Sequence, residues 1–227
     1  MIFEVNSIIE NESNGGRMKM DKKTAITISR QFGSGGHEIG ELLAQLLGIH
    51  FIDREVVTET AKTSDIAQSV IESMDEKPTT SFLYSLVMGL KPGKLGPDEY
   101  DMPLPQKVFH AEYNTIRRIA AEKSAVFVGR CADYALKDTV RCVRIFIYAP
   151  LDAQIRRIDE RMKVDRDRAA ELIEKADKNR ASYYTYYTGN KWGRAENYDI
   201  CISSALCGTE GTVDSLERIV KNFLDAQ

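Results

Sequence analysis

The feature that most constrains the fold is a glycine-rich segment placed between two apolar segments of different periodicity. Residues 25–29 (AITIS) form a β-branched run typical of a buried strand, and GSGG follows at 33–36. From His37 onward, isoleucine and leucine recur at the spacing of one helical face, and Gly48 marks the expected helix end. The sequence therefore predicts a strand, a glycine loop and a helix in this order.

Such a loop is suited to binding phosphate. The first backbone N–H groups of a helix have no partner within the helix, and the positive end of the helix dipole points the same way. Glycines let the backbone approach phosphate oxygens closely. We therefore predict that residues 33–36 bind a nucleotide or a similar phosphorylated ligand; the alternative is a plain strand-to-helix turn.

The rest of the chain continues the alternation of strands and helices. Further strands are expected at 50–53, 125–128, 143–149 and 198–203. Helices are expected at 108–120 and 213–224, and at 151–180 as a charged arm that leads into an aromatic loop at 183–187. Five prolines make 75–105 a loop-rich region. The alternation predicts an α/β fold whose parallel sheet of about five strands carries helices on both faces.

Composition narrows the class of protein. The 227 residues are 43% hydrophobic and 29% charged, as in an ordinary globular domain, and we expect one domain over 23–227 with an extension at 1–22. A net charge of −3 predicts no nucleic-acid partner.

The four cysteines are far apart and form no CxxC pair, so we expect reduced thiols and no zinc. Without a long apolar run or a signal segment, we expect no membrane partner and a cytoplasmic location.

Several ordered motifs resemble the cytidylate kinase-like members of the P-loop nucleoside monophosphate kinases. The stretch 28–40 (ISRQFGSGGHEIG) looks like the loop of that family, and the resemblance continues at 51–53 (FID), 128–130 (VGR), 177–180 (DKNR) and 187–193 (YTGNKWG). It extends from about Lys23 to the C-terminus. The resemblance implies a P-loop three-layer sandwich with an acceptor-side insert at 54–110 and a lid-like arm at 151–195.

The same resemblance implies transfer of a phosphoryl group from ATP, with Mg²⁺, to a nucleoside monophosphate such as CMP or dCMP. A small nucleotide would then be the only expected partner, and no oligomeric state is predicted. The residues that would hold the donor phosphates or lie beside them are Gly33, Ser34, Gly35, Gly36, His37 and Glu38. The residues that would face the acceptor are Asp53, Arg130, Asp133 and Asp177. The arginines that would neutralise the transferring group are Arg30, Arg157, Arg161 and Arg180.

The loop departs from the pattern G-x-x-x-x-G-K-[ST] at three positions. With Gly35 as the second glycine, Arg30 stands at the first glycine, Gly36 at the lysine and His37 at the hydroxyl residue. Arg30 is the nearest candidate to replace the lysine, and a surface arginine is the alternative. Because Mg²⁺ prefers oxygen, His37 is a poor ligand for it; Glu38 or Asp53 could position the metal instead, and no ligand is assigned.

The acceptor side also departs from the family pattern. Arg54-Glu55 follows Asp53 where cytidylate kinases have Thr-Gly, and Cys131-Ala132-Asp133 follows Arg130 in place of Asp-Ile-Gly. Asp133 would then replace an aspartate at a displacement of two residues. Three hypotheses follow: a nucleoside monophosphate kinase, a non-catalytic nucleotide-binding regulatory module, and a kinase for another small acceptor.

Overall fold

The computed structural model describes residues 23–74, 102–138 and 141–225. The predicted N-terminal extension, 1–22, and most of the proline-rich region, 75–101, lie outside these ranges. Pro103 and Pro105 lie inside them, at the N-cap and in the first turn of a helix, where proline is well tolerated.

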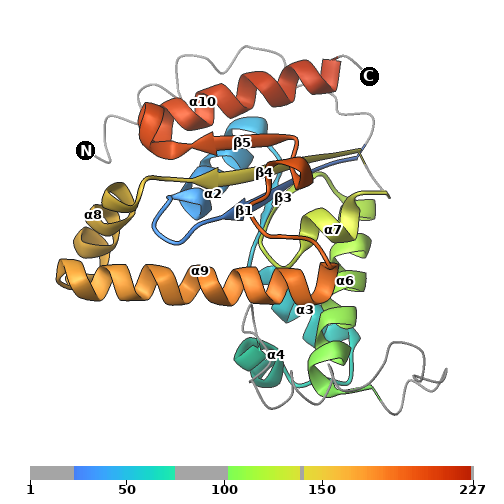
Figure 1. The fold of residues 1–227 in the computed structure, drawn as a ribbon. Helices are drawn as coiled ribbons and strands as arrows, with labels where there is room; N and C mark the ends of the chain where they lie inside the picture. The colour runs from blue at the N-terminus through green and yellow to red at the C-terminus, as the bar shows by residue number, and fades with distance from the viewer. Residues whose placement is uncertain (1–22, 75–101, 139–140, 226–227) are drawn as a thin grey trace.

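A five-stranded parallel sheet forms the centre of the molecule, in the order β2-β3-β1-β4-β5 (Figure 1). The strands are β1 (Thr24–Arg30), β2 (His50–Ile52), β3 (Ala125–Val128), β4 (Arg141–Tyr148) and β5 (Ile200–Ser203). Each overlaps a segment predicted as a strand, and β1 and β4 begin one and two residues before the predicted starts. The first strand is central and buried along nearly its whole length, which explains its continuous β-branched sequence.

One face of the sheet is covered by two helices, α2 (Gly36–Leu47) and α10 (Ser204–Asp225) (Figure 1). Their apolar stripes meet the isoleucines and valines of β1, β3 and β4 in one buried cluster. Helix α2 ends at Gly48, as predicted, with a backbone φ of 64°. Helix α10 begins nine residues before its predicted start at 213 and contains a kink at Gly208.

The opposite face is covered by α3 (Glu55–Thr63), α6 (Leu104–Glu122) and α7 (Ala132–Leu136). Helix α4 (Gln68–Met74) packs against α3 and α6. Ile116, Ile119 and Phe127 are fully or almost fully buried in this second core. Two helical layers around one sheet confirm the predicted three-layer α/β sandwich.

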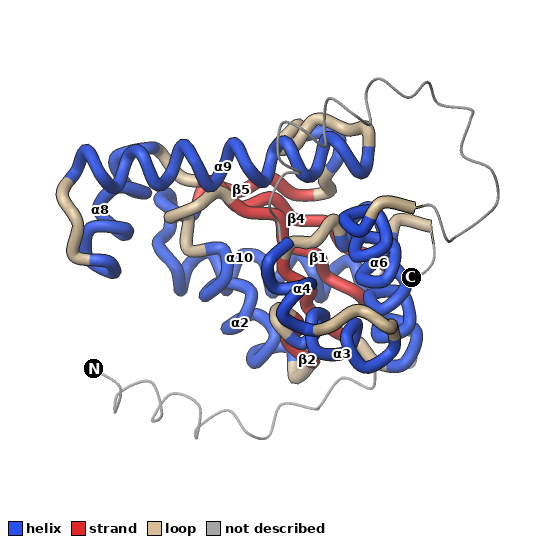
Figure 2. The backbone as a smooth tube through the Cα atoms, turned by 90° about the horizontal axis from the view of Figure 1, so that it is seen from below, coloured by secondary structure: helices blue, strands red, loops and turns tan. Residues whose placement is uncertain are grey.

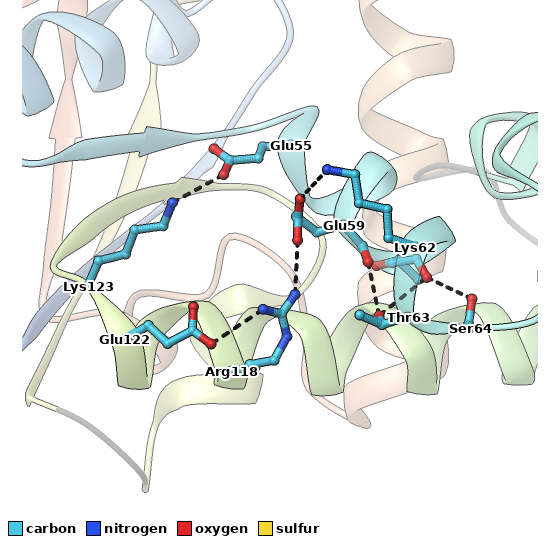
Figure 3. Close-up of polar contacts among 9 residues, drawn as sticks. Glu55, Glu59, Lys62, Thr63, Ser64, Arg118, Glu122 and Lys123 are labelled. Atoms are coloured by element: carbon cyan, nitrogen blue, oxygen red, sulfur yellow. Dashed lines mark hydrogen bonds and ion pairs between the residues drawn. The ribbon is translucent and has the colours of Figure 1, made fainter.

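Ion pairs fix α3 against α6 (Figure 3). Arg118 donates to Glu59 at 3.2 Å, and Lys123 pairs with Glu55 at 3.1 Å. Hydrogen bonds from Lys62 and Arg118 lower the pKa of Glu59. Because these side chains are partly exposed to solvent, each pair contributes little to the free energy of folding.

A helical arm formed by α8 (Leu151–Met162) and α9 (Arg166–Thr188) follows β4. Figures 1 and 2 show α9 running past the sheet, from α8 at one end to α6 and α7 at the other. The turn η2 (Ala195–Asn197) then leads to β5. None of the helices in the described ranges is both long enough and apolar enough to cross a membrane.

The prediction of an aromatic loop at 183–187 was wrong, because α9 continues through these residues to Thr188. Tertiary packing explains the difference. Tyr183 and Tyr184 are buried, and the ring of Tyr187 stacks on Phe109 of α6 at 4.1 Å between centroids. The aromatic residues are moderate helix formers by themselves, and burial against α6 and α7 stabilises them as helix.

Substitution of Ile145 tests the central core. Ile145 is fully buried in β4, so Ile145→Ala should lower the free energy of unfolding by about 2–5 kcal/mol. Ile219→Ala is the matched control, because Ile219 is 44% exposed on α10 and its loss should change stability by less than about 0.5 kcal/mol. Urea unfolding measures both, and equal losses would contradict the assigned core.

Candidate active site

The glycine loop leaves the carboxyl end of β1 and opens α2. Gly33 and Gly35 have φ values of 79° and 77°, in the left-handed region where glycine is favoured. A Cβ on Gly33 would lie 2.9 Å from the carbonyl oxygen of Gln154, so the loop also requires glycine for space. Gly35 is the N-cap of α2 and makes no side-chain capping bond. The start of α2 therefore has the geometry expected of a phosphate-binding site.

Residues distant in sequence hold the loop in place. The Asp177 carboxylate, on α9, accepts a hydrogen bond from the backbone N–H of Phe32 at 2.7 Å. The Ser204 hydroxyl, at the start of α10, donates to the carbonyl oxygen of Ser34 at 2.6 Å. Both contacts bind loop backbone rather than loop side chains, so they set the path of the main chain before any ligand arrives.

Gln31 provides a third anchor. Its side-chain oxygen accepts hydrogen bonds from the Gln154 amide at 2.7 Å and from the backbone N–H of Ala149 at 3.2 Å. Gln154 is buried at the start of α8 and also donates to the carbonyl oxygen of Ala149. The loop is thus bound to the first turn of the arm that also carries Arg157 and Arg161.

A cavity of about 790 Å³ lies in front of the loop. It is lined by the end of β1, the glycine loop, α2 and the two residues after β2, and by residues of α8 and α9. The predicted site residues that line it are Arg30, Gly33, Gly35, Gly36, His37, Glu38, Asp53, Arg157, Arg161 and Arg180. Ser34 is fully buried, and its hydroxyl donates to the carbonyl oxygen of Gln31. Ten of the fourteen predicted residues therefore share one cavity.

Two arginines of the arm lie against the loop itself. Arg157 pairs with Glu38 at 2.9 Å and donates to the Thr209 hydroxyl at 3.3 Å, and its Nη1 lies 2.7 Å from where a Cβ on Gly35 would stand. Arg180 donates to the carbonyl oxygen of Arg30 at 3.2 Å. The arm thus brings positive charge to the side of the loop where phosphates would bind.

His37 and Asp53 form a pair at the edge of the cavity. The His37 Nε2 atom lies 3.0 Å from an oxygen of Asp53, and the imidazole packs edge-on against Phe51. Among the described residues, no three His, Cys, Asp or Glu side chains gather closely enough to bind a metal by themselves. Mg²⁺ commonly binds one or two carboxylates together with substrate phosphates, and Asp53 and Glu38 fit that donor set.

Comparison with known proteins identifies the family. Residues 25–206 match the sequence model of the cytidylate kinase-like family. The chain belongs to this family. No protein among the curated, functionally described sequences matches it.

The solved structures that resemble this cytidylate kinase-like chain include an uncharacterized protein and a shikimate kinase. An uncharacterized protein from Eubacterium ventriosum is 30% identical with a TM-score of 0.64, and the match covers 91% of this chain and 100% of that one. A shikimate kinase from Bacteroides thetaiotaomicron is 16% identical with a TM-score of 0.50, and the match covers 87% of this chain and 98% of that one. The second likeness bears on the fold alone, which is that of the P-loop kinases.

Arg130, predicted to face the acceptor, lies outside the large cavity. Its side chain is 4% exposed and pairs with Glu112, itself 2% exposed, at 2.8 Å. The Tyr183 hydroxyl donates to the same carboxylate at 3.4 Å. Arg130 and Cys131 both have φ values of 54°, a conformation that non-glycine residues rarely adopt and that is often found at functional sites. A small cavity beside Arg130 is also lined by Arg180, so the two arginines are neighbours across it.

Asp133 and Asp177, the other acceptor-side predictions, are bound within the protein. Asp133 is buried and accepts a hydrogen bond of 2.6 Å from the Tyr184 hydroxyl; burial raises its pKa. Burial also raises the pKa of Asp177, which accepts from Phe32. Neither lines the large cavity. Their roles toward an acceptor stay predictions, and the structure shows Asp177 positioning the loop.

Several residues that shape the site were not predicted. Gln31 stands in the motif that marked the family, yet no role was assigned to it. Gln154, Ser204 and Glu112 had no sequence signal, because each acts through a contact between segments far apart in the chain. Only the folded arrangement brings them to the loop or to Arg130.

Removal of the Asp177 carboxylate tests its anchoring role. Asp177→Ala should leave the Phe32 N–H without its acceptor and speed exchange of that amide by about tenfold or more. Asp177→Asn keeps an acceptor oxygen and should exchange nearly as the wild type does. Hydrogen exchange monitored by NMR measures both, and equal exchange in all three proteins would contradict the assignment.

The buried carboxyl of Asp133 should make stability depend on pH. Its pKa is raised in the folded state, so its stabilising contribution is complete below the unfolded pKa and is lost as pH rises through the folded pKa. Asp133→Asn keeps an acceptor for Tyr184 and cannot ionise. The melting temperature of Asp133→Asn minus that of the wild type should therefore increase between about pH 4 and pH 8. A difference in melting temperature that stays constant across this pH range would contradict the prediction.

Proposed function

We propose that this chain transfers the γ-phosphoryl group of ATP to a nucleoside monophosphate, CMP or dCMP. Membership of the cytidylate kinase-like family and the P-loop kinase fold support nucleotide-dependent phosphoryl transfer. The observation that carries the proposal is the cavity in which the glycine loop faces Arg157, Arg161 and Arg180. A phosphate cradle opposite several arginines is the arrangement that this reaction requires.

In the proposed reaction, an oxygen of the acceptor phosphate forms a bond to the γ-phosphorus while the bond to the β,γ-bridging oxygen breaks, releasing ADP. The residues supply position and charge rather than covalent chemistry. The start of α2 would hold the donor phosphates, and the arginines of the arm would neutralise charge on the transferring group. Bound Mg²⁺ would contribute further neutralisation, with Asp53 and Glu38 as its available carboxylates.

An activity assay tests the proposal directly. The purified chain is incubated with ATP, Mg²⁺ and a panel of nucleoside monophosphates, and ADP and the phosphorylated product are measured. CMP and dCMP should give the highest kcat/KM. Absence of a phosphorylated product with every nucleotide would contradict the proposal, and ATP binding without turnover would favour a nucleotide-binding regulatory module.

Arg161 provides a sharper test within the active site. Arg161 lines the cavity, so Arg161→Ala should lower kcat/KM by roughly 10²–10³-fold, the usual cost of removing one charge donor from a transition state. Arg168→Ala is the matched control, because Arg168 lies on exposed α9 surface and pairs with Glu171. Equal kcat/KM values of the two variants would contradict a catalytic role for Arg161.

A kinase for another small acceptor is a second candidate. The observation that favours it is the internal pairing of Arg130 with Glu112 and of Asp133 with Tyr184, which occupies the side chains predicted to bind the nucleotide acceptor. The same assay separates the candidates when small polyols and hydroxy acids are added to the panel. Turnover of one of these and not of CMP would establish the second candidate.

A further inference from the structure

Gly36 stands where a P-loop carries its lysine, and its backbone does not explain why it is glycine. It is the first residue of α2, and its φ lies outside the left-handed region that favours glycine. Gly33 and Gly35, in contrast, adopt that region. The requirement for glycine at position 36 must therefore be steric.

The space at position 36 is filled by Arg30. A Cβ on Gly36 would lie 2.5 Å from the Cβ of Arg30 and 3.1 Å from its Cγ, whereas Ile147 is at 3.4 Å. The Arg30 Cβ is attached directly to β1, so it cannot move aside as the end of a long side chain could. A side chain at position 36 is thus incompatible with a side chain at position 30.

Arg30 itself stands where the P-loop pattern has its first glycine. In a loop with glycine at that position, no Cβ is present and the lysine has room. Here the two positions have exchanged: a cation replaces the glycine, and a glycine replaces the cation. The two departures from the pattern are therefore one coupled change.

Arg30 also begins close to the place where the lysine would begin. Its side chain starts within 2.5 Å of the missing Cβ at position 36 and lines the cavity in front of the loop with Arg157 and Arg180. Its charge opposes the rise that burial causes in the pKa of Asp177. Arg157, the other arginine close to the loop, pairs with Glu38 and donates to Thr209, and its guanidinium lies beside Gly35 rather than Gly36.

We propose that the charge which P-loops carry on a lysine at the position of Gly36 is carried in this chain by Arg30. The guanidinium contacts the β- and γ-phosphates of a bound nucleoside triphosphate, and Gly36 is retained because the Arg30 stem occupies the space of its side chain. The role of the charge rests on the proposed function. The steric exchange does not.

The steric part is tested by melting temperature. Gly36→Ala is introduced into the wild type, into Arg30→Ala, which keeps the clashing Cβ, and into Arg30→Gly, which removes it. The added Cβ should lower the melting temperature by roughly 5 °C in the first two backgrounds and by much less in the third. A similar decrease in melting temperature in all three backgrounds would contradict the steric coupling of positions 30 and 36.

The charge is tested by calorimetric binding of a non-hydrolysable ATP analogue, with ADP as the comparison. Arg30→Ala and Arg30→Gly should each weaken binding of the triphosphate by about 10- to 100-fold and binding of ADP by less. The double variant Arg30→Gly/Gly36→Lys should recover most of the preference for triphosphate, because it returns the cation to position 36.

Four outcomes distinguish the inference from the proposed function. Wild-type affinity in Arg30→Ala, or no recovery in the double variant, overturns the role of Arg30 while nucleotide binding by the wild type stands. Loss of the triphosphate preference in Arg157→Ala and not in Arg30→Ala assigns the charge to Arg157 instead. A wild-type chain that binds no nucleotide contradicts the proposed function and the role of the charge together, and the melting series still decides the steric exchange.

Discussion

The anchoring of the glycine loop is the interaction on which the rest of the site depends. A phosphate-binding loop must hold its N–H groups toward the ligand, and a run of glycines has little intrinsic preference for any one path. In this chain Asp177, Ser204 and Gln31 bind the loop or its flanking residues at short distances. The loop therefore loses its conformational entropy when the protein folds and not when a ligand binds, and this favours tight binding.

The same contacts connect the loop to the elements that carry positive charge. Asp177 lies three residues before Arg180 on α9, and Gln154 lies three residues before Arg157 on α8. The bond from the Phe32 N–H to Asp177 and the bond from Gln154 to the Gln31 side chain therefore also position the cavity's arginines. This arrangement fits a reaction in which the protein contributes placement and electrostatics, because small displacements of charge carry large costs in rate.

Two of the residues predicted to face the acceptor are paired within the protein. Arg130 with Glu112 and Asp133 with Tyr184 are buried pairs, and breaking a buried ion pair is costly. The left-handed backbone at Arg130 and Cys131 adds local strain in the same place. Asp53 and the residues predicted to lie near the donor phosphates, apart from the buried Ser34, line an open cavity, whereas Arg130 and Asp133 lie in a packed interior.

The sequence by itself determined the order of elements, the parallel sheet and the phosphate loop, because β-branched runs, helical periodicity and glycine spacing are local signals. The resemblance of its motifs to the cytidylate kinase-like family also identified most of the charged residues that line the cavity. Only the tertiary structure decided that 183–187 is helical, that Arg130 and Asp133 are internally paired, and that Gln154 and Ser204 hold the loop and its flanking residue Gln31. It also showed why position 36 is glycine: the Cβ of Arg30, six residues away in sequence, lies 2.5 Å from where a Cβ at position 36 would stand.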